Sequence, residues 1–201
     1  LTSPDGETWT TRTSGTTQDL EEVTYANSTF VTVGYSGTIL TSPDGETWTT
    51  RTSGVSGFLW GVTYANSMFV AVGASGTILS SPDGTTWTSQ TSGTIEHLSR
   101  TAYANSRFVV VGDRGTILTS SDGITWSVQA SGTTEDLYGV TYGNSTFVAV
   151  GTTGTILTSP DGITWTTQTS GTTEWLYGVT YANSTFVATG AEGTILTSPD
   201  G

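Results

Sequence analysis

The sequence lacks cysteine and lysine and has no long apolar stretch. Without cysteine, neither disulfides nor thiolate metal sites can hold the fold together, and the redox compartment stays undefined. Five arginines are outnumbered by 17 acidic residues, which gives a net charge of −12 and should repel nucleic acid and anionic lipid. No apolar run approaches the ~20 residues needed to cross a bilayer. We therefore expect neither a nucleic-acid partner nor membrane insertion.

A short motif recurs along the whole chain. The sequence Leu-Thr-Ser-Pro-Asp-Gly begins at Leu1 and returns, with small changes, at a spacing of 39 residues. The later copies begin at Leu40, Leu79, Leu118, Leu157 and Leu196. Because the chain begins and ends within this motif, we expect it to be a piece of a longer protein.

Each period contains four predicted strands, named A to D, which are easiest to mark in the second copy. Strand A covers about Leu59–Ala65, strand B the apolar run Phe69–Val72, strand C Thr77–Ser80 and strand D Thr86–Thr91. The turn Pro82-Asp83-Gly84 joins C to D with residues that favour tight turns. The pattern predicts an all-β protein made of four-stranded antiparallel units.

A four-stranded unit cannot bury both of its faces alone, so the copies should pack radially as a closed five-bladed β-propeller. The N-terminal strand D, Glu7–Thr13, is expected to complete the last blade, although the duplicated six residues compete for one strand C position. The alternative is a linear solenoid or an open arc. We expect a single domain, 1–201, as a monomeric ring with blades at about 15–53, 54–92, 93–131, 132–170, and 171–201 plus 1–14.

The segments Ser3–Trp9 and Ser159–Trp165 resemble the Asp-box of BNR-repeat and sialidase-like propellers, shortened by one residue between Asp and Gly. The preceding Gly-Thr-Ile-Leu is similar to photosynthesis assembly factors and to highly repetitive bacterial propellers. The resemblance implies that the motif aspartates are folding elements between the third and fourth strands, not catalytic groups or calcium ligands. These are Asp5, Asp44, Asp83, Asp122, Asp161 and Asp200. The repeated tryptophans should cover blade interfaces, contributing roughly 2–3 kcal/mol each.

Comparison of the five copies separates uniform from variable segments. The A–B and C–D turns are nearly identical in every copy, whereas the D–A loops, the starts of strand A and the B–C turns differ. Strand parity places these variable segments together on one rim, named here the variable rim. It carries the non-repeating aromatic residues and several charged ones, which are the candidate ligand-binding residues. They are Tyr35, Phe58, Trp60, His97, Arg100, Asp113, Arg114, Tyr138, Trp175 and Tyr177.

The candidate residues favour binding over catalysis. A sialidase needs an arginine cluster for a carboxylate, yet only Arg100 and Arg114 reach this rim, so a glycoside hydrolase-like enzyme is disfavoured. A single histidine cannot build a His-based metal site, and no catalytic triad or phosphate loop is present, so no cofactor or metal is expected. Drift of unconstrained surface loops would also produce variation, but drift does not favour exposed aromatic residues.

Two binding functions follow from this pattern. The first is a protein-interaction or sensor platform, which the asymmetry of the variable rim favours. The second is a lectin-like module with aromatic residues that stack on sugars, for which five similar pockets are expected. A bacterial extracellular or cell-surface location and a cytoplasmic multidomain protein are both compatible with the sequence.

Overall fold

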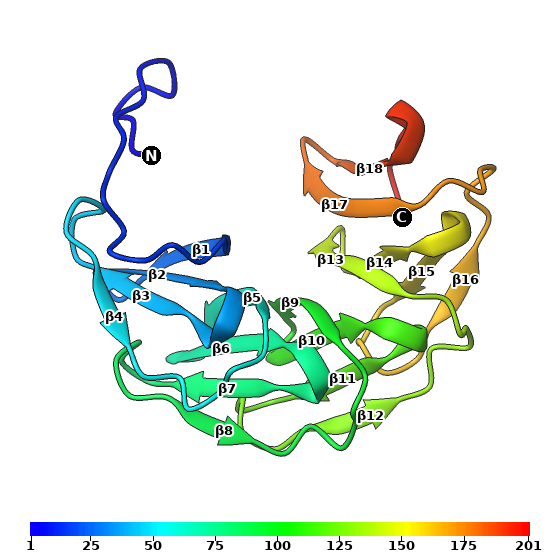
Figure 1. The fold of residues 1–201 in the computed structure, drawn as a ribbon. Helices are drawn as coiled ribbons and strands as arrows, with labels where there is room; N and C mark the ends of the chain where they lie inside the picture. Colours follow the sequence, from blue (N-terminus) through cyan, green and yellow to red (C-terminus); the bar gives the residue numbers. More distant parts are fainter.

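The computed structural model describes residues 1–201 and is all-β. Its strands form five antiparallel sheets arranged side by side as propeller blades (Figure 1). The first four blades have four strands and the fifth has three, each in meander order. The predicted all-β architecture of five blades is confirmed. No helix has the length and apolar character required to span a membrane.

The strands recur at equivalent positions in each blade. Blade 1 contains β1 (Leu20–Ala26), β2 (Thr29–Gly34), β3 (Ile39–Ser42) and β4 (Thr49–Arg51). Blade 2 contains β5 (Leu59–Ala65), β6 (Met68–Gly73), β7 (Ile78–Ser81) and β8 (Thr88–Gln90). Blade 3 contains β9 (Leu98–Ala104), β10 (Arg107–Gly112), β11 (Ile117–Ser120) and β12 (Ser127–Gln129). Blade 4 contains β13 (Leu137–Gly143), β14 (Thr146–Gly151), β15 (Ile156–Ser159) and β16 (Thr166–Gln168). Blade 5 contains β17 (Leu176–Ala182), β18 (Thr185–Gly190) and β19 (Ile195–Ser198).

The core lies between neighbouring blades. In β6, Phe69 and Ala71 pack into a cluster shared with blade 1, whereas Val70 and Val72 pack into the next cluster, shared with blade 3. All four side chains are fully buried. A strand covered on both faces needs an apolar run rather than an alternating pattern. This explains why β6, β10 and β14 contain continuous apolar runs, whereas the equivalent runs of β2 and β18 each contain one threonine, Thr32 and Thr189.

The first strands of neighbouring blades contact each other along the inner side of the arc, and the fourth strands lie outermost (Figure 1). A bulge near the start of each first strand shifts its register, as between Leu59 and Gly61. Gly61 fits there because an added Cβ would lie 3.1 Å from the Ser99 carbonyl oxygen of blade 3. The bulge therefore allows close approach of adjacent inner strands.

The C–D turns are organised by their own Ser and Asp side chains. In blade 3, the Asp122 carboxylate accepts hydrogen bonds from the backbone N–H groups of Ile124 and Thr125, both at 2.8 Å. The Ser120 hydroxyl donates to the same carboxylate and accepts from Gly123 N–H. These bonds to the charged form lower the pKa of Asp122. The motif aspartate thus stabilises its own turn.

The arrangement at the two chain ends differs from the predicted closure. The last sheet ends at β19 without a fourth strand, and the N-terminal segment lies across a gap from blade 5 (Figure 1). Its only ladder contact is the bridge between Thr2 and Thr10. Thr2 therefore already occupies the strand C position beside the N-terminal strand D. The N-terminal copy of the Leu-Thr-Ser-Pro-Asp-Gly motif, and not the C-terminal copy, therefore pairs with the N-terminal strand D. The last blade is left with three strands, and the five blades form an open arc.

Candidate functional site

The variable segments gather on one rim of the arc. In blade 3, Asp113 of the B–C turn donates its N–H to the His97 carbonyl oxygen in the preceding D–A loop, at 2.9 Å. A second contact joins blade 2 to blade 3, because the Ser75 N–H of the blade 2 B–C turn donates to His97 Nδ1 at 3.0 Å. On the opposite rim, the A–B turn residue Asn66 donates to the carbonyl oxygen of Ser121 in a C–D turn. Uniform and variable segments therefore occupy separate rims, as strand parity predicts.

A first aromatic cluster spans blades 1 to 3. Tyr35, in the turn η1 (Tyr35–Gly37), stacks on Phe58 with ring centroids 4.3 Å apart. The Phe58 ring lies 5.9 Å from that of Trp60, which is 5.3 Å from the His97 imidazole. Phe58 remains 41% exposed. The four side chains form a continuous, partly exposed row along the variable rim.

A second aromatic cluster lies on blades 4 and 5. The Tyr138 ring lies 6.2 Å from Trp175 and 6.0 Å from Tyr177. Trp175 and Tyr177 are 50% and 53% exposed. Exposed tryptophan and tyrosine are typical of interface hot spots because they provide a large contact area with a polar handle.

Charged residues separate the two aromatic clusters. The backbone N–H of Arg114 donates to the Asp136 carboxylate at 2.8 Å. The guanidinium group of the same residue lies 3.8 Å from the Glu96 carboxylate. Partial burial and the Asp136 charge raise the pKa of Asp113, and burial followed by the same aspartate raises the pKa of Tyr138. Three carboxylates, those of Glu96, Asp113 and Asp136, therefore lie between the clusters, with one exposed arginine among them.

Arg100 takes a different place from the other candidates. Its guanidinium donates to the Trp60 carbonyl oxygen at 2.7 Å and lies 4.0 Å from the Glu22 carboxylate. Glu22 in turn accepts a hydrogen bond from Val62 N–H at 2.6 Å. Burial raises the pKa of Glu22, whereas the Val62 bond and the Arg100 charge oppose that rise. Arg100 and Glu22 thus bind the inner strand of blade 2 from the blades on either side.

The B–C turns hold their central residues in the left-handed region. The five turns are η1, η2 (Ala74–Gly76), η3 (Asp113–Gly115), η4 (Thr152–Gly154) and η5 (Ala191–Gly193). Arg114 has a φ of 54° and Glu192 a φ of 51°, values that glycine adopts without strain. None of the five central positions carries glycine, and the side chains there are Ser36, Ser75, Arg114, Thr153 and Glu192. The five turns therefore project four kinds of side chain, with serine in two of them, from the same backbone geometry.

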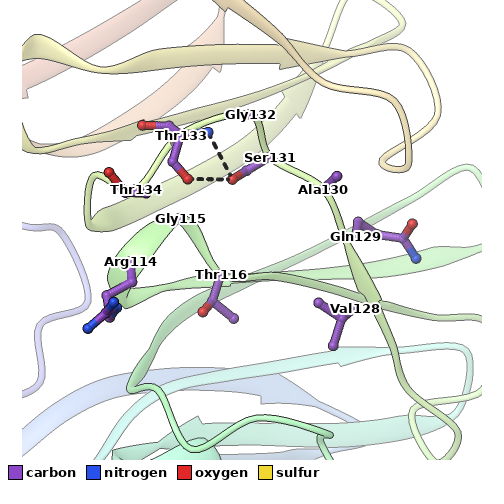
Figure 2. Close-up of a pocket in the computed structure, with 10 residues that line it drawn as sticks. All are labelled: Arg114, Gly115, Thr116, Val128, Gln129, Ala130, Ser131, Gly132, Thr133 and Thr134. Atoms are coloured by element: carbon purple, nitrogen blue, oxygen red, sulfur yellow. Dashed lines mark hydrogen bonds between the residues drawn. The ribbon is translucent and has the colours of Figure 1, made fainter.

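Three equivalent grooves run beside the B–C turns of blades 2, 3 and 4. Their volumes are about 650, 640 and 660 Å³. Figure 2 shows the blade 3 groove, where the Ser131 hydroxyl donates to the Thr133 carbonyl oxygen and accepts from its N–H. Gly115 has a φ of +69°, and an added Cβ would lie 2.2 Å from that same carbonyl oxygen. The lining is mainly Thr, Ser and Gln, and no aromatic residue contributes to it.

The structure adds acidic residues that the sequence analysis did not include among the candidates. Glu96 and Asp136 contact the Arg114 turn, and Glu135 accepts hydrogen bonds from the hydroxyls of Thr152 and Thr153. Glu96 and Glu135 occupy equivalent positions in successive D–A loops, and such recurrence is typical of a solvated edge. Glu22, Gly61 and Arg100 occupy the same position in successive repeats. The opposite charges of Glu22 and Arg100 at this position are the sequence signal for their ion pair across the inner strand of blade 2.

No protein-family model and no curated protein matches the chain. Solved β-propellers do resemble it at low sequence identity. YCF48 bound to D1 peptide aligns with a TM-score of 0.72 at 19% identity, over 92% of this chain and 65% of that one. The computationally designed Ika8 protein gives 0.72 at 13% identity, over 89% of this chain and 57% of its own. The WD40 β-propeller domain of Doa1 gives 0.69 at 17%, over 90% and 65%. The chain is thus similar in fold to β-propellers and spans less than two thirds of these three chains.

Proposed function

We propose that the protein is a non-catalytic binding module that docks a protein or peptide segment on the variable rim. The observation that carries this proposal is the gathering of the non-repeating aromatic side chains into two partly exposed clusters on that rim. A rigid propeller that presents irregular loops from one rim is suited to recognition, because the ordered scaffold lowers the entropy cost of docking.

The distribution of side chains supports one irregular partner. Phe58 and Trp60 belong to blade 2, whereas Trp175 and Tyr177 belong to blade 5, and the acidic segment lies between them. A partner with apolar residues on both sides of a basic stretch would match this order. YCF48, one of the similar propellers, is known bound to a D1 peptide. At 19% identity this supports peptide docking as a proposal for this chain.

The engagement of the cationic side chains supports binding without catalysis. Arg100 donates to backbone carbonyl oxygens, and the His97 imidazole accepts a backbone hydrogen bond through Nδ1. Arg114 lies beside Glu96. These groups stabilise the rim itself and do not converge as a carboxylate clamp or an acid–base pair would require.

A carbohydrate ligand is the second candidate. The three equivalent hydroxyl-rich grooves favour it, because repeated polar sites would bind a repeated ligand with avidity. The absence of aromatic residues from these grooves makes it the weaker candidate, since sugar binding commonly uses an aromatic platform.

Selection from a random peptide-display library tests the proposal directly. Peptides that bind the wild-type chain should lose affinity for Trp60→Ala or Trp175→Ala by about 30-fold, which corresponds to roughly 2 kcal/mol. Both variants should keep melting temperatures close to that of the wild type. Ile124→Ala is the matched control, because Ile124 is 47% exposed and lies at a uniform C–D turn.

Two results would contradict peptide docking. One is selection of peptides whose binding is unchanged by both tryptophan variants. The other is multivalent binding on a glycan array that is unaffected by both variants, which would favour the carbohydrate candidate.

A further inference from the structure

The internal blade interfaces define what each blade surface packs against. Between blades 1 and 2, Val31 and Ile39 on one side meet Leu59 and Val62 on the other, and all four are at most 4% exposed. Equivalent clusters occupy the next interfaces. Each blade thus has two different packing surfaces. One, equivalent to Val31 and Ile39, contacts the following blade, and the other, equivalent to Leu59 and Val62, contacts the preceding blade.

The residues equivalent to these buried interface positions are exposed to solvent at the two ends of the arc. Leu20 and Val23, which correspond to Leu59 and Val62, are 41% and 58% exposed on blade 1. At the other end Ile195, which corresponds to Ile39, is 67% exposed on blade 5. The chain therefore exposes one unpartnered surface of each kind.

The aromatic pair of each blade is also divided between the ends. In blade 2, the rings of Phe69 and Trp87 lie 6.4 Å apart. Phe186 of blade 5 lacks its strand D tryptophan and borders a cavity of about 240 Å³ beside β19. The corresponding tryptophan is Trp9, which is 57% exposed on the N-terminal segment. Each end holds the half of the pair that the other lacks.

The N-terminal segment occupies the place of the outer strand of a preceding blade. Its bridge between Thr2 and Thr10 is equivalent to the pairing of Thr41 with Thr49 in blade 1, and Arg12 forms an ion pair with Glu46. A hollow of about 650 Å³ separates this segment from blade 1 and is lined by Leu1, Arg12, Leu20, Val23, Phe30 and Trp48. The hollow thus lies where the inner strands of a preceding blade would pack.

We propose that this hollow receives the last blade, β17–β19, of a second copy of the chain. The incoming β19 displaces residues 1–3 and pairs with the N-terminal strand D, with Thr197 opposite Thr10. In blade 4 the equivalent strands make three residue pairs, whereas residues 1–3 contribute the single Thr2–Thr10 bridge. The exchange therefore increases ladder pairing and covers Leu20, Val23 and Ile195.

The arrangement favours a second copy over the chain's own last blade. That blade lies on the far side of the gap (Figure 1). To reach the hollow, it would have to tilt the packed interfaces between successive blades, and close-packed interfaces resist such changes. The two surfaces differ, so the contact is head-to-tail and leads to a ring or a filament. With a net charge of −12 on each copy, added salt should strengthen association.

Mixing two single-cysteine variants tests the contact. Thr10→Cys and Thr197→Cys, combined and oxidised, should form a disulfide-linked pair of different chains, because the two positions face each other in the proposed register. Thr49→Cys mixed with Thr197→Cys is the matched control and should not cross-link, since Thr49 already pairs with Thr41. Absence of the Thr10–Thr197 link would overturn the proposal, as would a double variant that links within one chain at low concentration.

Two truncations give a second measurement by sedimentation velocity. Removal of residues 1–6 eliminates the competing strand C residues and should strengthen association, whereas removal of residues 1–14 eliminates strand D and should abolish it. The full chain should sediment as more than one copy at high concentration and dissociate on dilution. A mass of one chain at every concentration would overturn the proposal, as would association that residues 1–14 do not affect.

Discussion

The rings of Tyr35 and Phe58 stack 4.3 Å apart with planes inclined by 24°, although the two residues belong to neighbouring structural units. The stack joins the B–C turn of blade 1 to the loop that enters blade 2. A double-mutant cycle with Tyr35→Ala and Phe58→Ala should give a coupling of about 0.5–1.5 kcal/mol in the free energy of unfolding. Urea denaturation provides the measurement. Phe58→Ala with Tyr177→Ala is the control and should be additive, and equal additivity in both cycles would show that the stack contributes nothing.

One repeat position permits a direct comparison of buried and exposed leucines. Leu98 is fully buried between blades, whereas Leu20 at the equivalent position is 41% exposed. Leu98→Ala should lower the free energy of unfolding by about 2–5 kcal/mol. Leu20→Ala should cost much less in dilute solution, where a second copy does not cover it. Comparable losses for the two variants at low concentration would indicate that Leu20 is already packed within a single chain.

The C–D turn aspartates should make stability depend on acid. The folded-state pKa of Asp122 lies below the ordinary value of 3.8 because backbone N–H groups bind its charged form. Its contribution is thus present above 3.8 and lost as the pH falls towards the folded-state pKa. Asp122→Asn should reduce the difference in melting temperature between about pH 5 and about pH 2.5. A wild-type acid response that persists unchanged in the variant would exclude this role.

The contribution of Glu22 to stability should change with pH in the opposite direction to that of Asp122. Its folded-state pKa is raised by burial above the ordinary 4.5, so its stabilising contribution is lost as the pH rises through the folded-state value. Glu22→Gln keeps an oxygen acceptor for Val62 N–H and should be at least as stable as the wild type at neutral pH. Glu22→Ala leaves that N–H unpaired and should cost about 1–3 kcal/mol. Urea unfolding at two pH values separates these expectations, and equal losses for both variants would disprove them.

The sequence predicts the local structure well because it is encoded within each repeat. The observed β5, Leu59–Ala65, coincides with the predicted strand A, and β6 contains the predicted run Phe69–Val72. The common rim of the variable turns follows from strand parity, and the hydrogen bond between Asp113 N–H and the His97 carbonyl oxygen agrees with it.

Features that depend on how the blades are placed relative to each other could not be predicted in the same way. Closure depends on the angle between blades, and residue periodicity carries no measure of that angle. The contact between Glu22 and Val62 joins residues of different repeats, and it requires the bulge that brings inner strands together. The variability of the Arg100 position predicts ligand binding, but the hydrogen bond from its guanidinium to the Trp60 carbonyl oxygen forms only when blades 2 and 3 are packed.

The central residues of the B–C turns have positive φ angles, so at these positions the stability of the backbone conflicts with the presentation of a side chain. Arg114, Thr153 and Glu192 hold backbone angles that cost side-chain-bearing residues of order 1 kcal/mol each. Glycine would relieve that strain but would leave the turn without a side chain. The chain thus tolerates a less stable backbone at the turns where it presents chemically distinct groups to its surroundings, so the most thermostable version of this arc of blades would also be its least distinctive.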